Sequence, residues 1–184
     1  MKKVLFTAAL TLVSIGLLAQ VSSTEKQALL DLYMATNGAN WTQSWDVNAP
    51  VEEWQGVTVT NNKVTAISLL FNKVKGKLPA TIGNLEHLKT LELSFNEISG
   101  QLPESLGQLG QLEVLAFNGN NLSGEIPSSL GKLKNLKKLH LSSNSFSGTI
   151  PTELEGMGRL EVFNVFDNNL GGDLPVNLAS NKNL

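Results

Sequence analysis

The 184-residue sequence has no cysteine, only two histidines and no concentration of basic charge. Without cysteine the chain cannot form disulfides, bind metals through thiolates or use a thiol nucleophile. Fourteen Lys and Arg residues stand against 16 Asp and Glu residues, so the formal net charge is -2. Nucleic-acid binding needs a concentrated basic surface. We therefore expect no nucleic-acid partner. We also expect no cofactor.

The N-terminus is typical of an export signal. Met1-Lys2-Lys3 is basic, Val4 to Leu18 is an apolar stretch, and Ala19 offers a small residue for cleavage. The apolar stretch is shorter than the roughly 20 residues that a membrane-spanning helix needs. We expect residues 1–19 to be a cleaved signal peptide, with an uncleaved anchor as the alternative. The remaining chain has no other span, so the protein is expected to be secreted or at the cell surface.

The rest of the chain is dominated by an internal repeat. Five units of equal length begin at Val64, Leu88, Leu112, Leu136 and Leu160, fill residues 64–183, and leave residue 184 as the start of an incomplete sixth unit. Three columns are invariant in all five units: Asn72, Asn96, Asn120, Asn144 and Asn168; Gly76, Gly100, Gly124, Gly148 and Gly172; and Pro79, Pro103, Pro127, Pro151 and Pro175. A fixed period of this length indicates a solenoid.

Each column has a physical role. Apolar residues at the first, fourth and sixth positions alternate with polar ones, which predicts a short strand with one buried face. Stacked units then pair these strands into a parallel sheet. The asparagines are expected to be structural, because a side-chain amide can bond to turn backbone groups of neighbouring units. Glycine suits a position with positive φ, and proline fixes φ where no N–H is needed.

The pattern LxxLxLxxNxLxGxIPxxLGxL resembles the plant-type leucine-rich repeats of plant receptor ectodomains and polygalacturonase inhibitors. The resemblance implies an α/β repeat solenoid: a right-handed superhelix with a parallel concave sheet, a second short strand per unit, helical turns on the convex side and an N-terminal helical cap. The fifth unit departs from the pattern, with Glu155 and Ala179 in place of glycine and Asn181 at an apolar position.

Residues 20–63 resemble the cap that precedes such repeats. Thr24 to Gln27 fits a capping box, and the helix it starts is expected to end at Asn37-Gly38. Trp41, Trp45 and Trp54 are either packed inside this cap or exposed as a sugar-stacking platform. Plant caps commonly carry a cysteine pair here, and this chain has none. Together with the short Lys-Lys signal, that difference favours a bacterial relative.

The histidines do not form a catalytic constellation. His87 falls in a turn between units, whereas His140 points outward from a strand. On the expected sheet Glu92 lies two strands from His140, about 10 Å away at about 4.8 Å per strand, which is too far for direct proton transfer. No Gly-x-Ser-x-Gly, phosphate-loop or His-Glu-x-x-His motif is present. The sequence predicts that the protein is not an enzyme.

Outward-facing strand positions vary from unit to unit, which is typical of a recognition surface. The candidate ligand-binding residues are Thr90, Glu92, Ser94, Asn118, Lys138, His140, Ser142, Asn164 and Phe166. Leu70, Phe71 and Phe95 form either a small apolar binding patch or a flank buried under the cap. Alternating Lys89, Glu113, Lys137 and Glu161 suggest a ladder of exposed ion pairs that supports register.

These features favour an interaction module that binds a protein, peptide or polysaccharide ligand through its concave face. One alternative is a structural spacer of a larger surface protein, and another is an inhibitor of a cell-wall-degrading enzyme. The last unit has no polar closing helix, so its strand edge is a possible site of self-association.

Overall fold

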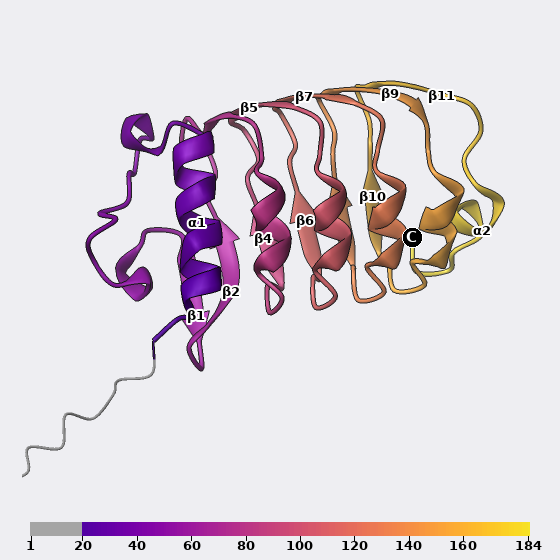
Figure 1. Cartoon of the computed structure of the whole chain (residues 1–184). Coiled ribbons are helices and arrows are strands. Elements are labelled where there is room, and N and C mark those ends of the chain that lie inside the picture. The colour runs from indigo at the N-terminus through magenta and orange to yellow at the C-terminus, as the bar shows by residue number, and fades with distance from the viewer. Residues whose placement is uncertain (1–19) are drawn as a thin grey trace, which may run out of the picture.

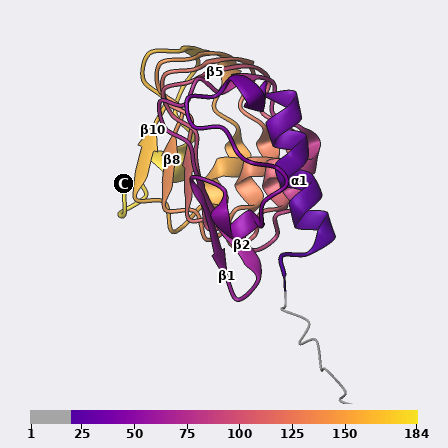
Figure 2. The ribbon, with the colours of Figure 1, turned by 90° about the vertical axis from the view of Figure 1, so that its left-hand side faces the viewer.

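The protein is described by a computed structural model that covers residues 20–184, and the expected signal segment lies outside this range. The chain winds into a row of stacked coils, with helix α1 (Ser23–Ala35) at one end and α2 (Val176–Ala179) at the other (Figure 1). Seen along this row, one sheet and the helical turns face each other, and a second sheet runs across the top (Figure 2). The expected α/β solenoid is confirmed.

The first, concave sheet is built from six strands in the order β1-β2-β4-β6-β8-β10. Its members are β1 (Val57–Thr60), β2 (Lys63–Ser68), β4 (Thr90–Glu92), β6 (Val114–Ala116), β8 (Lys138–His140) and β10 (Val162–Asn164). The β1–β2 pair is antiparallel, and all the following pairs are parallel. Thr90 pairs with Val114 and Val114 with Lys138, so each strand residue pairs with its equivalent in the next unit.

The second sheet joins β11, β9, β7, β5 and β3 in that order. These strands are β3 (Lys75–Gly76), β5 (Glu97–Gly100), β7 (Asn121–Gly124), β9 (Ser145–Thr149) and β11 (Asn169–Gly171). Here Ser99 pairs with Asn121 and Ser123 with Ser145, so the partner lies two positions before the equivalent residue of the next unit. The second sheet is therefore staggered relative to the repeat, which the sequence period alone does not predict.

Short 3-10 helices form the convex side: η3 (Ala80–Asn84), η4 (Glu104–Gln108), η5 (Ser128–Lys132) and η6 (Thr152–Gly156). Between them and the concave sheet lies a continuous apolar core. The first leucine of each unit from Leu88 to Leu160 is fully buried, as are Leu91, Leu115 and Leu139 on the strands. Full burial of such a side chain contributes about 1.5–3 kcal/mol, so each unit is stabilised by stacking on its neighbours.

The asparagine column forms a hydrogen-bond ladder inside the turns. The amide nitrogen of Asn120 donates to the carbonyl oxygens of Leu93 and Phe117, both at 3.0 Å, and its oxygen accepts the Ile98 N–H at 3.0 Å. Leu93 and Ile98 belong to the preceding unit. Asn144 and Asn168 repeat the arrangement. The ladder thus satisfies buried backbone groups and ties adjacent units together.

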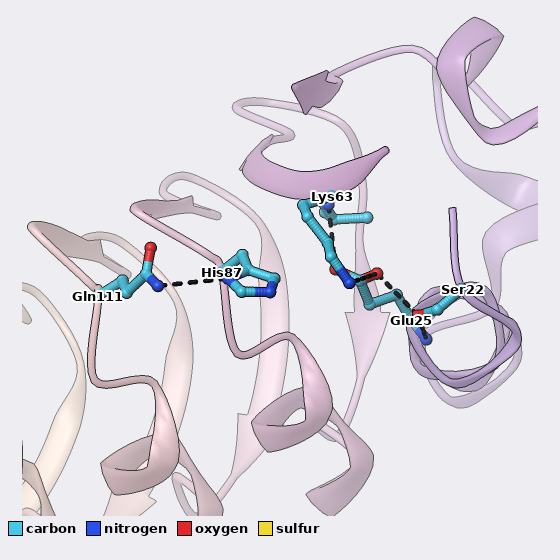
Figure 3. A network of polar contacts seen from close by, with 6 residues as sticks. Ser22, Glu25, Lys63, His87 and Gln111 are labelled. Carbon is cyan, nitrogen blue, oxygen red and sulfur yellow. Dashed lines mark hydrogen bonds and ion pairs between the residues drawn. The ribbon is translucent and has the colours of Figure 1, made fainter. Parts of the chain in front are cut away.

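The N-terminal helix is capped two residues earlier than the sequence suggested. Its N-cap is Ser22, whose hydroxyl accepts the Glu25 N–H at 3.3 Å and donates to the Glu25 carboxylate at 2.7 Å. Thr24 lies inside the helix, so the expected Thr24 capping box is wrong. The reason is tertiary: Glu25 is buried and also accepts the Val64 N–H at 3.1 Å, which joins the helix to β2 (Figure 3).

The three tryptophans form the interior of the cap. Trp41, Trp45 and Trp54 are at most 5% exposed. Trp45 stacks on Trp54 with ring centroids 4.8 Å apart. Each indole N–H donates to a backbone carbonyl oxygen at 2.8–3.2 Å. These contacts decide between the two alternatives: the rings are core and not a sugar platform.

Candidate functional site

The outward positions of the concave sheet lie in register across the strands. Glu92, Ala116 and His140 are consecutive partners on β4, β6 and β8, and Asn164 follows on β10. Two strand spacings, about 10 Å in all, separate Glu92 from His140. The carboxylate and the imidazole therefore face the same surface without forming a catalytic pair.

The surface of this sheet is chemically varied. Lys138 is exposed, while Thr90, Glu92 and His140 are half-buried among their neighbours. Phe166 is 81% exposed, the highest value among the large apolar residues of the described chain. The sheet presents the Glu92 carboxylate near its N-terminal end, the Lys138 ammonium in its middle and the exposed Phe166 ring near its C-terminal end. This arrangement suits contact with an extended ligand that crosses several strands.

Three polar residues, in a row at the ends of successive strands, form hydrogen bonds with one another. The hydroxyl of Ser94 accepts the Asn118 N–H at 3.2 Å, and the side-chain oxygen of Asn118 accepts the N–H and the hydroxyl of Ser142 at 3.0 and 2.8 Å. Ser94 is only 1% exposed. The expectation that Ser94 faces a ligand is therefore corrected, because its side chain turns along the sheet and bonds to the next unit. Asn118 and Ser142 are half-buried in the same row.

Asn164 has a similar local role. Its side-chain oxygen accepts the N–H of Phe166 at 3.2 Å. This bond orients the backbone from which the exposed phenyl ring projects. Asn164, itself half-buried, thus supports Phe166.

Leu70, Phe71 and Phe95 are exposed and not covered by the cap. Their exposed fractions are 43%, 67% and 49%. The two rings are parallel within 3°, with centroids 4.6 Å apart. The ring of Phe95 also lies over Gly119, where an added Cβ would be 2.8 Å from a ring carbon. The structure therefore resolves the two sequence-based alternatives in favour of an open apolar patch.

The backbone under this patch was not expected from the sequence. Phe71 and Phe95 have φ values of +51° and +59°, and the matching residues of later units, Gly119, Ser143 and Asp167, have +62°, +53° and +56°. Bulky residues rarely adopt positive φ. The sequence did contain an indication of this conformation. The same repeat position holds Phe in the first two units and Gly, Ser and Asp in the last three.

The alternating charge column forms one ion pair rather than a ladder. The ammonium of Lys137 lies 2.6 Å from the Glu113 carboxylate, with both side chains about 40% exposed. The hydrogen bond from Lys137 and its positive charge lower the pKa of Glu113, against the opposing effect of burial. Neither Lys89 nor Glu161 takes part in an ion pair among the described residues. The pair supports register where β6 and β8 begin and does not form a reactive site.

Residues 20–184 contain no group of three or more His, Asp or Glu side chains that could hold a metal ion. In the same range no helix has the length and apolarity required to cross a membrane. His87 contacts Gln111 of the next unit at 3.2 Å (Figure 3). The outward side chains of the concave sheet and the exposed patch of Leu70, Phe71 and Phe95 are the candidate binding surfaces.

Comparison with known proteins gives a consistent result. A family model described as a leucine-rich repeat region matches residues 69–175. Polygalacturonase inhibitor 1 of Arabidopsis thaliana is 30% identical over 71 residues, which cover 36% of this chain and 22% of the inhibitor. The chain therefore spans only a minor part of that relative.

Solved structures are similar over a larger share. The BIR2 ectodomain from Arabidopsis thaliana has a TM-score of 0.77 at 30% identity and covers 86% of both chains. The plant peptide hormone receptor RGFR1, solved in complex with RGF2, has a TM-score of 0.62 at 38% identity over 64% of this chain and 19% of the receptor.

Proposed function

The chain belongs to the leucine-rich-repeat proteins, and we propose that it is a binding module that holds an extended protein or peptide segment across its concave sheet. In this proposal residues 20–63 form the cap, residues 64–183 form five repeats, and Leu184 begins a sixth. The module carries no cofactor and has no catalytic role.

One observation carries the proposal: the outward positions of the concave sheet vary while the scaffold positions do not. The apolar, Asn, Gly and Pro columns recur in each unit, whereas one outward column reads Ser68, Glu92, Ala116, His140 and Asn164. Stacked units hold these side chains on a rigid surface, which lowers the entropy cost of binding. A surface with separate anionic, cationic and aromatic parts suits a peptide of mixed composition. The peptide hormone receptor among the similar structures supports this ligand class.

The place of action follows from the N-terminus and the relatives. Residues 1–19 have the composition of a signal peptide, and a similar structure is an ectodomain. We therefore propose that the module acts outside the cytoplasm, secreted or at the cell surface. The proposal of a bacterial source rests only on the missing cysteine pair and the short Lys-Lys signal. Mass measurement of the exported protein tests this placement, since a mature terminus at Gln20 is expected.

The binding proposal is tested with arrays of peptides and glycans probed by the chain from Gln20 onward. A fourfold variant replaces Glu92, Lys138, His140 and Phe166 by Ala. A matched control replaces Ser145 and Ser147, which are exposed on the second sheet. We expect the fourfold variant to lose about tenfold or more in affinity for peptides while the control retains it. Equal binding by the unaltered chain, the fourfold variant and the control refutes the concave site. Binding to glycans alone changes the ligand class from peptide to glycan. Binding to neither array favours the structural spacer.

A second candidate is supported by the similarity to polygalacturonase inhibitor 1. In this alternative the concave face binds a cell-wall-degrading enzyme and blocks its cleft. Titration of a polygalacturonase with the chain tests it directly. Dose-dependent inhibition that disappears in the Glu92, Lys138 and His140 variants supports the inhibitor, and unchanged enzyme activity refutes it.

Self-association is a separate part of the proposal. Strand β10 lies at the edge of the concave sheet, and Leu174 and Val176 of the same unit are 42% and 76% exposed. An unpaired strand edge favours pairing with a second copy. Sedimentation velocity over a concentration series is expected to show a dimer, and a monomer at all concentrations contradicts it.

A further inference from the structure

Two exposed phenylalanines occupy a backbone conformation that the repeat imposes and phenylalanine disfavours. The turn position that follows each concave strand has φ between +51° and +62° in all five units. Glycine and aspartate tolerate this region, and the third and fifth units use them there. Phe71 and Phe95 adopt it although their rings are 67% and 49% exposed. Strain that is not offset by full burial is a marker of functional residues.

The ring geometry limits what this patch can recognise. Phe71 covers one face of Phe95, and the other side of Phe95 lies over Gly119. A flat sugar ring needs an open aromatic face, and of the ring faces in this stack only the outer face of Phe71, a residue 67% exposed, is left for one. The ring edges and the adjoining Leu70 are also available, and these suit a side chain. Ring edges carry partial positive charge and attract anionic groups. The patch is also small, so it suits a single side chain rather than a protein interface of about 1,200 Å² or more.

The charges around the patch are asymmetric. Lys73, Lys75 and Lys77 follow Phe71 on and beside β3. Of these three lysines only Lys75 has an ion-pair partner among the described residues, Glu97 at 3.0 Å. Lys73 lies two residues from Phe71 and is exposed. On the concave side Glu92 precedes Phe95 by three residues, about 10 Å at the usual strand rise. The patch thus lies between a basic rim and a carboxylate.

We propose that Leu70, Phe71 and Phe95, which we call the phenylalanine patch, anchor one apolar side chain of an extended peptide whose adjoining acidic residues contact the Lys73–Lys77 rim. This inference rests on the proposed binding function and adds to it an anchor position, an acidic ligand and a direction. The peptide crosses from the concave sheet onto the second sheet, with its acidic part toward β3.

The test uses three fluorescein-labelled synthetic octapeptides of otherwise identical sequence with Phe-Asp-Asp, Ala-Asp-Asp or Phe-Lys-Lys at the centre. Fluorescence anisotropy measures their affinity for the chain from Gln20 onward. We expect the Phe-Asp-Asp peptide to bind about tenfold more tightly than either of the others. Equal affinity for all three peptides overturns the inference.

Variants locate the site. Phe71→Ser combined with Phe95→Ser introduces the residue that occupies this position in the fourth unit. Met34→Ser removes another exposed apolar side chain, 77% exposed, from α1. We expect the double variant to keep or raise its thermal midpoint and to lose about tenfold in affinity for the Phe-Asp-Asp peptide, whereas Met34→Ser changes neither. A double variant that keeps its affinity overturns the inference, and so does one that unfolds at a much lower temperature, since the rings are then structural.

The fourfold concave variant separates this inference from the general function. If that variant loses peptide binding and the double variant does not, the anchor is wrong and the concave site stands. If the double variant alone loses binding, the anchor stands and the concave site is wrong. Cellohexaose serves as the sugar probe: binding that depends on Phe71 and Phe95, in the absence of peptide binding, overturns the peptide in favour of a glycan.

Discussion

Replacement of Asn120 by alanine is expected to destabilise the solenoid strongly, although it removes no apolar group. Asn120 is 8% exposed and lies in the third of the five units. Its amide nitrogen bonds to the oxygens of Leu93 and Phe117, and its amide oxygen bonds to the Ile98 N–H. Leu93 and Phe117 also accept bonds from Asn96 and Asn144, so each keeps one partner.

The magnitude follows from this accounting. Loss of a bond to a carbonyl that keeps another partner costs about 0.5–1.5 kcal/mol, and a buried N–H left without its acceptor costs about 1–3 kcal/mol. The total expected for Asn120→Ala is about 2–6 kcal/mol. A stability of about 5–15 kcal/mol is typical of domains, so this change is a large fraction of it.

Urea unfolding followed by circular dichroism measures the effect. The control is Asn121→Ala, since Asn121 is the exposed neighbour on β7 and is expected to change stability by less than about 0.5 kcal/mol. Asn168→Ala in the fifth unit, where Asn168 is half-buried, is expected to cost less than Asn120→Ala. A cost below about 1 kcal/mol at Asn120 refutes the view that the ladder holds adjacent units together.

Three further changes test the packing, the cap and the surface charge. Gly107→Ala is expected to destabilise by about 1–3 kcal/mol, because a Cβ there would lie 2.5 Å from the Ser129 backbone oxygen; thermal denaturation measures it. Ser22→Ala is expected to cost about 1 kcal/mol through loss of the N-cap, measured by urea unfolding. Lys137→Met is expected to raise the pKa of Glu113, read from its carboxyl 13C shift, because Lys137 lowers that pKa. Since the folded pKa lies below the unfolded one, the pair stabilises above the unfolded pKa, and this stability is lost as pH falls through the folded pKa.

Each of these changes has a matched control. Gly110→Ala meets no atom within 4 Å and is expected to be neutral within about 0.5 kcal/mol; an equal loss at both glycines contradicts the packing argument. Thr24→Ala is the control for Ser22→Ala in urea unfolding. A larger loss of stability at Thr24 than at Ser22 would mean that Thr24, and not Ser22, caps the helix. Lys89→Met removes a smaller influence on Glu113, so its effect on the pKa must be smaller than that of Lys137→Met.

Much of the architecture was readable from the sequence because each repeat obeys the same local rules. The strand leucines, the asparagine column and the positive-φ glycines are all set by their position within the repeat unit. Gly100, Gly124 and Gly148, for example, all have φ of +80°. The chemistry of the concave face was predictable in outline for the same reason, since strand alternation decides which side chains point outward.

Contacts between units and with the cap were decided only by the tertiary structure. Ser94 is buried because Asn118 of the next unit bonds to its hydroxyl, and the helix starts at Ser23 because buried Glu25 joins it to Val64. The exposed stack of Phe71 on Phe95 likewise depends on two units meeting. The sequence by itself determined the repeat, its period and its fold class, because these follow from short-range periodicity. The partners of individual side chains depend on how neighbouring coils pack in space, and this packing made the phenylalanine patch.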